Sequence, residues 1–189
     1  MTSSAPLQLI YSDVWGPSPV VSHDGFSYYV ILVDHFTKYT WLFPIKFKFE
    51  VLDVLTKFKS VAEKFFQRPI VSLYSDCGGE YIGLKSFVEQ HGITHFFTPP
   101  YTPKHNGMAE RCHRHVVETG LALLSQASVP QKFWTYAFRT ATYLINRMPT
   151  PVLDFISPFQ KLFGTKPNFE KLKNIWVFVL PLVETIFQN

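Results

Sequence analysis

Three apolar stretches in the first 45 residues have the composition of β-strands. Residues 7–14 (LQLIYSDV) form the first, which ends in an acid and is stopped by a Trp-Gly-Pro sequence. Residues 26–34 and 38–45 follow the turn-forming pair Asp24-Gly25 and are rich in aromatic and β-branched side chains. We therefore expect three consecutive strands at the start of the chain.

The spacing of apolar positions changes to three and four in residues 50–66, which predicts an amphipathic helix. Residues 70–75 (IVSLYS) then predict a short strand that also ends in an acid. A helix at about 84–91 and a strand at 93–97 are expected next. Residues 98–107 contain three prolines and an Asn-Gly pair, so we expect a loop there.

Helices are expected in the remainder of the chain. The pattern predicts one helix at about 108–126 and another at about 130–147, with Pro130 as the first residue of the second. A short helical turn follows Ser157 and is stopped by Gly164.

This order of elements predicts an α/β fold, with a mixed sheet flanked by helices and a C-terminal helical extension. We assign residues 1–147 to the core and 148–189 to the extension. The tail from about residue 175 is apolar and interrupted by a proline, and we expect it to lie outside the sheet.

Composition narrows the class of protein. The chain has 189 residues, of which 47% are hydrophobic and 17% charged, so it can bury a core. The formal net charge of +4 is compatible with a polyanionic partner, although many ordinary domains are as basic. Cys77 and Cys112 form no CxxC pair, which argues against a disulfide framework or a structural zinc site.

Residues 1–8 lack the features of a signal peptide, and the apolar runs are too short for a membrane helix. We expect an intracellular protein, nuclear or cytoplasmic, with no membrane partner.

Two acids occupy unusual positions at the ends of apolar strands. Asp13 and Asp76 are each preceded by Tyr-Ser, and Asp76 is followed closely by two glycines. Groups at strand ends can converge in one crevice, where a carboxylate is costly to desolvate unless it binds a cation or pairs. With Glu110 in the first turn of its helix, they form a set of three carboxylates that suits Mg²⁺ or Mn²⁺. Two such ions can stabilise both the attacking and the leaving oxygen of a phosphoryl displacement.

Each acid also has an ordinary interpretation. An Asp at a strand end is more often a cap or turn former, and we interpret Asp34 in that way. Glu110 can be a first-turn glutamate favoured by the helix dipole, with Arg114 as its i+4 partner. Only the ordered set Asp…Asp…Glu, in this context of strands and helix, favours a catalytic site.

Several segments resemble the integrase of copia-type long-terminal-repeat retrotransposons, particularly those of plants, where it is part of a Pol polyprotein. The matching segments are YSDVWGPSP, YYVILVDHFTKYTWLFPIK, YSDCGGEY, HGITHFFTPPYTPKHNGMAER and YLINRMPTPVL. The resemblance covers residues 7–174. It implies an RNase H-like fold, a catalytic triad of Asp13, Asp76 and Glu110, and two Mg²⁺ or Mn²⁺ ions bound by these three residues. It further implies 3′-end processing of element DNA, strand transfer into target DNA, and a homo-oligomer in the active form.

The chain departs from the family pattern in a few places. Thirty-three residues separate Asp76 from Glu110, about two fewer than in the family. The shortening falls at about residues 82–84, before the loop and helix that contain Glu110, so we expect the triad to survive. Cys77 stands where the family has Asn, the family's upstream zinc-binding module is missing, and the family pattern fails after about Asn174.

Cationic and polar residues gather around the expected loop and the start of the Glu110 helix, where they can contact DNA phosphates. The alternative is a solvated basic helix face. The candidates are Lys104, His105, Asn106, Arg111 and Arg114. Cys112 with the nearby histidines does not suggest zinc, because consecutive helix positions cannot face one metal.

Three functional hypotheses follow. The leading one is a Mg²⁺-dependent polynucleotidyl transferase of the integrase type. The second is an inactive or co-opted remnant that binds nucleic acid or protein. The third and weaker one is an RNase H-like nuclease with the same metals.

Overall fold

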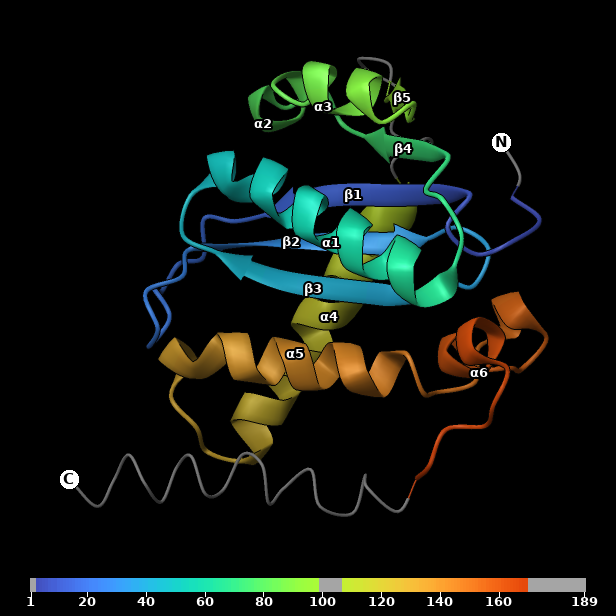
Figure 1. Ribbon diagram of the computed structural model, residues 1–189. Helices are drawn as coiled ribbons and strands as arrows, with labels where there is room; N and C mark the ends of the chain where they lie inside the picture. The colour runs from blue at the N-terminus through green and yellow to red at the C-terminus, as the bar shows by residue number, and fades with distance from the viewer. Residues whose placement is uncertain (1–2, 99–106, 170–189) are drawn as a thin grey trace.

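A five-stranded mixed sheet forms the centre of the protein (Figure 1). The structure is a computed structural model that describes residues 3–98 and 107–169. The strand order is β3-β2-β1-β4-β5; β1, β2 and β3 pair antiparallel, and β4 is parallel to both β1 and β5. The strands are β1 (Leu9–Trp15), β2 (Tyr28–Asp34), β3 (Thr40–Ile45), β4 (Ser72–Ser75) and β5 (Thr94–Phe97).

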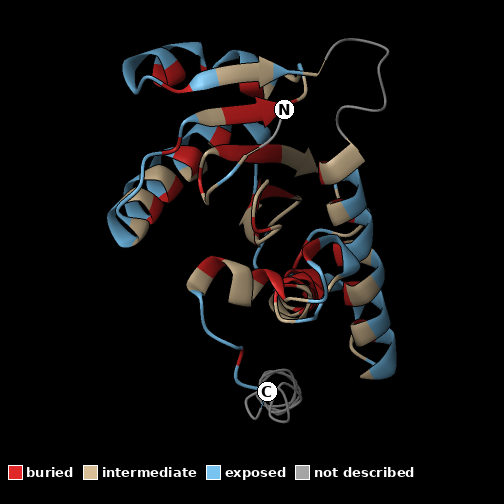
Figure 2. Ribbon diagram, turned by 90° about the vertical axis from the view of Figure 1, so that its right-hand side faces the viewer, coloured by how far each residue is buried: buried red, intermediate tan, exposed pale blue. Residues whose placement is uncertain are grey.

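Helices cover both faces of this sheet, and the resulting layers are seen edge-on in Figure 2. Helices α1, α2 and α3 share one apolar core with the sheet, and α4 and α5 share the other. The helices are η1 (Lys48–Glu50), α1 (Val51–Phe66), α2 (Gly79–Ile82), α3 (Lys85–Gln90), α4 (Gly107–Gln126), η2 (Gln131–Phe133), α5 (Trp134–Ile145), η3 (Pro151–Leu153) and α6 (Pro158–Phe163).

The sequence pattern explains the two cores. In β2 the side chains alternate between faces: Val30 and Leu32 belong to the α1 core, whereas Tyr29, Ile31 and Val33 belong to the α4–α5 core. All five are fully buried, as expected for a strand with neighbours on both sides and helices on both faces. Strand β2 therefore reads as a continuous apolar run.

The mixed sheet flanked by helices that the sequence predicts is confirmed. Asp34 is also a turn former, as interpreted, because its buried carboxylate accepts hydrogen bonds from the backbone N–H of Leu7 and of Thr37 at 2.8 and 2.7 Å. Ser157 accepts a hydrogen bond from the N–H of Gln160 and so caps α6, which ends at Gly164.

Two details of the prediction are wrong. Pro130 does not open an α-helix: its backbone is extended, the single 3-10 turn η2 follows it, and α5 begins at Trp134. The short helix α2 was not expected, because its four residues give too little periodicity to detect.

Two sequence expectations lie outside the described residues: most of the loop at 98–107, and the tail from residue 175. None of the helices in the described part of the chain combines the length and apolar character needed to cross a membrane.

Candidate active site

The residues that precede Asp13 and Asp76 are in register on the neighbouring parallel strands β1 and β4. Tyr11 of β1 pairs with Tyr74 of β4, and their rings lie 4.9 Å apart. Asp13 and Asp76 each stand two residues further along the chain. The repeated Tyr-Ser-Asp sequence is thus aligned between the strands, and this alignment brings both acids to one edge of the sheet.

Asp13 belongs to the face that α4 and α5 cover. Alternate residues of a strand share a face, so Asp13 follows Leu9 and Tyr11 in a row that ends with Trp15. The other three side chains of that row pack in the α4–α5 core. Asp13 is the charged member of the row, and its side chain is only 15% exposed.

The Asp13 carboxylate has defined neighbours at both oxygens. Oδ1 accepts a hydrogen bond from the backbone N–H of Val14 at 2.9 Å. Oδ2 lies 3.3 Å from Nε2 of His113, a buried residue of α4. The other ring nitrogen of His113 lies 3.0 Å from the hydroxyl of Tyr29 on β2. A buried polar chain therefore links β2, α4 and β1 at the candidate site.

Asp76 is in an unfavourable environment for a negative charge. Burial raises the pKa of its carboxyl above the ordinary value, and the nearby charges of Asp13 and Glu80 raise it further. The backbone N–H of Gly78, which donates to Oδ1 at 3.0 Å, and the ammonium of Lys48 act in the opposite direction. The net effect is a carboxylate whose charge is incompletely compensated.

Sequence reasoning missed Glu80 and Lys48, which lie beside Asp76. Their side chains form an ion pair of 3.0 Å, in which Glu80 is 9% exposed and Lys48 46% exposed. A Cβ at Gly78 would lie 2.9 Å from the Glu80 carboxylate and 3.0 Å from Oδ1 of Asp76, so the two acids need a glycine between them. The position of Glu80 in the quoted YSDCGGEY segment was the available signal.

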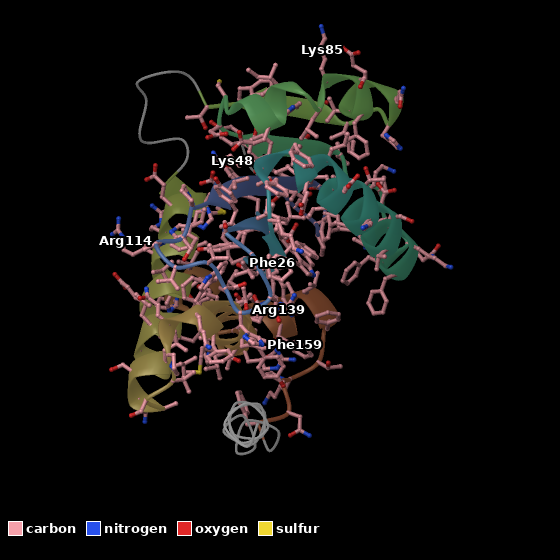
Figure 3. All side chains as sticks on the ribbon, turned by 90° about the vertical axis from the view of Figure 1, so that its left-hand side faces the viewer. Phe26, Lys48, Lys85, Arg114, Arg139 and Phe159 are labelled. Atoms are coloured by element: carbon pink, nitrogen blue, oxygen red, sulfur yellow. The ribbon has the colours of Figure 1, made fainter. Side chains whose placement is uncertain are left out.

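The short helix that contains Glu80 is fixed to β1 from the opposite face of the sheet. The hydroxyls of Tyr81 and Ser12 are fully buried and lie 2.7 Å apart. Figure 3 shows Lys48 near the start of α1, on the side where α2 lies. Contacts with β1 and with the start of α1 thus fix the position of α2, and with it Glu80.

Glu110 lies in the first turn of α4 and is exposed. Across residues 3–98 and 107–169, no three His, Cys, Asp or Glu side chains are grouped closely enough to hold a metal ion together. The convergence of Glu110 with the two aspartates stays a prediction.

The predicted DNA contacts are partly described. Arg111 and Arg114 are exposed on α4, and Arg114 points outward from this helix (Figure 3). Lys104, His105 and Asn106 lie outside the described residues. Cys112 is in contact with the Thr40 hydroxyl at 3.7 Å, and burial raises the pKa of its thiol.

Comparison with known proteins establishes the family to which the chain belongs. Residues 3–103, more than half of the chain, match the integrase core domain. The chain belongs to this family. The integrase core is 61% identical over 92% of its length to the retrovirus-related Pol polyprotein from transposon RE2 of Arabidopsis thaliana, and 57% identical over 92% to that from transposon RE1. It is 38% identical over 88% of its length to the Pol polyprotein from transposon TNT 1-94 of Nicotiana tabacum.

The resemblance to the integrase of plant copia-type retrotransposons is thereby confirmed. The chain spans 12% of the length of the two Arabidopsis relatives and 13% of the tobacco one.

Solved structures support the fold. The integrase core is similar to a chain of the simian T-cell lymphotropic virus intasome, with a TM-score of 0.66, 18% identity and coverage of 86% of this chain and 57% of that one. It is also similar to the catalytic core domain of BIV integrase, with a TM-score of 0.57, 16% identity and coverage of 84% of this chain and 95% of that one. The expected RNase H-like fold is confirmed.

Proposed function

We propose that this integrase core catalyses Mg²⁺-dependent processing of the 3′ ends of element DNA and their transfer into target DNA. The observation that supports the proposal most directly is the aligned pair Asp13 and Asp76, at the carboxyl ends of adjacent parallel strands in an integrase core domain. A pair of carboxylates in this position is suited to hold a cation against a phosphate.

Asp13, Asp76 and Glu110 are the proposed ligands of two Mg²⁺ or Mn²⁺ ions. Their carboxylate oxygens fit the preference of these cations for oxygen ligands. The raised pKa of Asp76 supports the assignment, because a cation would relieve the repulsion from Asp13 and Glu80. When bound, the ions would act as Lewis acids on the phosphate and lower the pKa of the attacking hydroxyl or water. We propose that Glu110 joins the aspartates when cation and DNA are present.

DNA is the proposed partner, both as element ends and as target. The exposed guanidinium groups of Arg111 and Arg114 are the described candidates for phosphate contacts, together with Lys104, His105 and Asn106 of the preceding loop. A homo-oligomer is proposed for the active form, and the nucleus or cytoplasm as its location.

One observation favours a second candidate function. Because Glu110 is exposed and is not grouped with the aspartates among the described residues, the chain can also be a remnant that binds nucleic acid or protein without catalysis. This candidate predicts DNA binding without metal-dependent joining.

A strand-transfer and disintegration assay in Mg²⁺ separates the two candidates. Asp13→Asn, Asp76→Asn and Glu110→Gln should each reduce joining to background, while the protein stays folded. Glu118→Gln is the matched control, because Glu118 is also an exposed acid of α4, and it should keep wild-type activity. Wild-type protein that binds DNA but joins none would support the remnant. Equal activity in all variants would assign the activity to a contaminant.

A further inference from the structure

We propose that His113 is a positioning residue that holds the Asp13 carboxylate in one orientation, and that Tyr29 fixes which ring nitrogen of His113 has the proton. The inference rests on the proposed function, in which Asp13 is a metal ligand. It gives positioning roles to two residues that the sequence analysis did not propose as site residues.

The position of His113 follows from the packing of α4 on the sheet. His113 stands three residues after Glu110, so both side chains belong to neighbouring positions on one side of α4. Helix α4 packs on β1 and β2, and His113 is buried at this contact, with 8% of its surface exposed. Its ring centroid lies 5.2 Å from that of Tyr29. The imidazole therefore fills the space between β2 and the Asp13 carboxylate.

Tyr29 and Asp13 can both reach this ring because of the antiparallel register. Tyr29 pairs with Trp15, and Asp13 pairs with Ile31, two residues after Tyr29. Residues two apart on a strand share a face, so Tyr29 and Asp13 are diagonal neighbours on the α4 side of the sheet.

The protons can be assigned from the partners. Burial raises the pKa of Tyr29 well above its ordinary value, and the charge of Asp13 raises it further, so the hydroxyl keeps its proton. The hydroxyl can then donate to Nδ1 of His113, at 3.0 Å. In the neutral imidazole this arrangement places the ring proton on Nε2. Nε2 then faces Oδ2 of Asp13, which accepts only.

The distance between Nε2 of His113 and Oδ2 of Asp13 is longer than that of a good hydrogen bond. The two atoms are 3.3 Å apart, which is within the range of an ion pair. Among the described residues, however, no acceptor has hydrogen-bond geometry toward the buried Nε2 atom. A buried donor without a hydrogen-bond partner is unfavourable, so a small shift of the ring toward the carboxylate would be stabilising. Hydrogen bonds at active sites also shorten when ligands bind.

This contact would fix the plane of the Asp13 carboxylate. The Val14 N–H donates to Oδ1, and a hydrogen bond from His113 to Oδ2 would leave the carboxylate unable to rotate freely before a cation binds. Residues that orient a metal ligand in this way typically contribute about 10-fold to 100-fold in metal affinity or activity.

The first test is independent of both catalysis and metal. Melting temperatures of the full chain are compared for wild type, His113→Leu, Asp13→Ala and the double variant. If His113 contacts Asp13, the double variant's shift will differ from the sum of the two single shifts. His91→Leu, which removes an exposed imidazole at the end of α3, is the control and should be additive with Asp13→Ala. Additivity of His113→Leu with Asp13→Ala overturns the inference.

The second test measures the consequence for turnover. His113→Leu should lower kcat by about 10-fold to 100-fold in the strand-transfer assay while the KM for DNA stays near the wild-type value. His113→Gln places an amide donor near the position of Nε2 and should recover most of that loss. Tyr29→Phe leaves the proton free to move between the ring nitrogens of His113. Its kcat should lie between those of His113→Leu and His113→Gln. Wild-type kcat in His113→Leu, or no rescue by His113→Gln, overturns the inference.

The two tests separate this inference from the proposed function. A wild-type chain without metal-dependent joining contradicts the proposed function, and the melting-temperature comparison still decides whether His113 holds Asp13. A wild-type chain that joins DNA, with additive melting shifts for His113 and Asp13, contradicts only the role of His113.

Discussion

Asp76 shows at the residue scale how a proposed metal ligand can lower stability. Its folded-state pKa is raised, first by burial and then by the charges of Asp13 and Glu80. Between the ordinary value of 3.8 and the raised one, the folded chain binds more protons than the unfolded chain. Stability contributed by this group is therefore lost as the pH rises through that window.

Asp76→Asn should accordingly raise the melting temperature at pH 7 and have little effect at a pH well below 3.8, where the aspartate is protonated in both states. The gain should stay under about 1 kcal/mol, because water screens a partly exposed group. Asp53→Asn is the control: Asp53 is an exposed acid in the first turn of α1, where the helix dipole favours its charge, so its loss should destabilise slightly. A fall in melting temperature for Asp76→Asn at pH 7 would show that this charge is stabilising.

The sequence indicates some of these residues and not others. Asp13 and Asp76 are conspicuous because each ends an apolar strand after the same two residues, and local sequence alone determines that pattern. His113 and Glu80 are not conspicuous, because their roles depend on how α4 and α2 pack on the sheet. In the sequence, His113 is one of several polar residues on a helix, and only burial beside Tyr29 distinguishes it.

At the scale of elements, the contact between α4 and α5 determines how α4, the helix that contains Glu110, packs on the sheet. Gly120 of α4 is buried, and a Cβ built there would overlap the ring of Phe138 of α5, with Cε1 at 2.8 Å. Phe138 in turn contacts Trp15 of β1, with ring centroids 5.7 Å apart. The glycine lets the two helices approach closely enough to cover the strand that contains Asp13.

Gly120→Ala should therefore destabilise the chain even though alanine favours a helix by about 1 kcal/mol. Overpacking of a buried contact typically costs about 1–3 kcal/mol, which exceeds that gain. Denaturant unfolding measures the difference, and Gly83→Ala, where a Cβ meets only ordinary contacts, should be nearly neutral. The double variant Gly120→Ala with Phe138→Leu should lose less free energy of unfolding than the sum of the losses in the two single variants. Additive losses would contradict a direct overlap.

Element boundaries show where sequence patterns stop being sufficient. Helix α1 was predicted closely because Val51, Leu55, Phe58 and Ala62 recur at helical spacing on one buried face. The start of α5 was predicted wrongly because Pro130 is compatible with either a first helical position or an extended cap. Its carbonyl accepts from the N–H of Phe133 in the 3-10 turn, and this choice depends on tertiary packing.

At the scale of the whole molecule, the mixed sheet determines where chemistry and DNA can meet. The parallel pair β1 and β4 directs both aspartates to one edge, and α4 begins with Glu110 and continues with Arg111 and Arg114. One sheet and one helix thus place the carboxylates that we propose as cation ligands and the guanidinium groups that we propose as phosphate contacts. The described phosphate-contact candidates are few, being the two exposed guanidinium groups of Arg111 and Arg114.

Binding of DNA by this chain should therefore be weak, largely indifferent to sequence and strongly dependent on salt, because phosphate contacts release counterions. Arg114→Glu should lower affinity alike for all DNA sequences and reduce the slope of log affinity against log salt by about one unit. Fluorescence anisotropy with unrelated duplexes over a range of salt concentrations measures both quantities.

The control for that experiment is Lys85→Glu, which changes the net charge by the same amount at an exposed position on α3, away from α4 (Figure 3). A smaller effect of Lys85→Glu locates the DNA contact on α4, since long-range attraction alone would respond equally to both substitutions. Equal losses would mean that the overall charge of +4, and no particular surface, attracts DNA. Tight binding that is insensitive to salt would show that base contacts or apolar contacts dominate, and that the helix face around Arg114 is merely solvated.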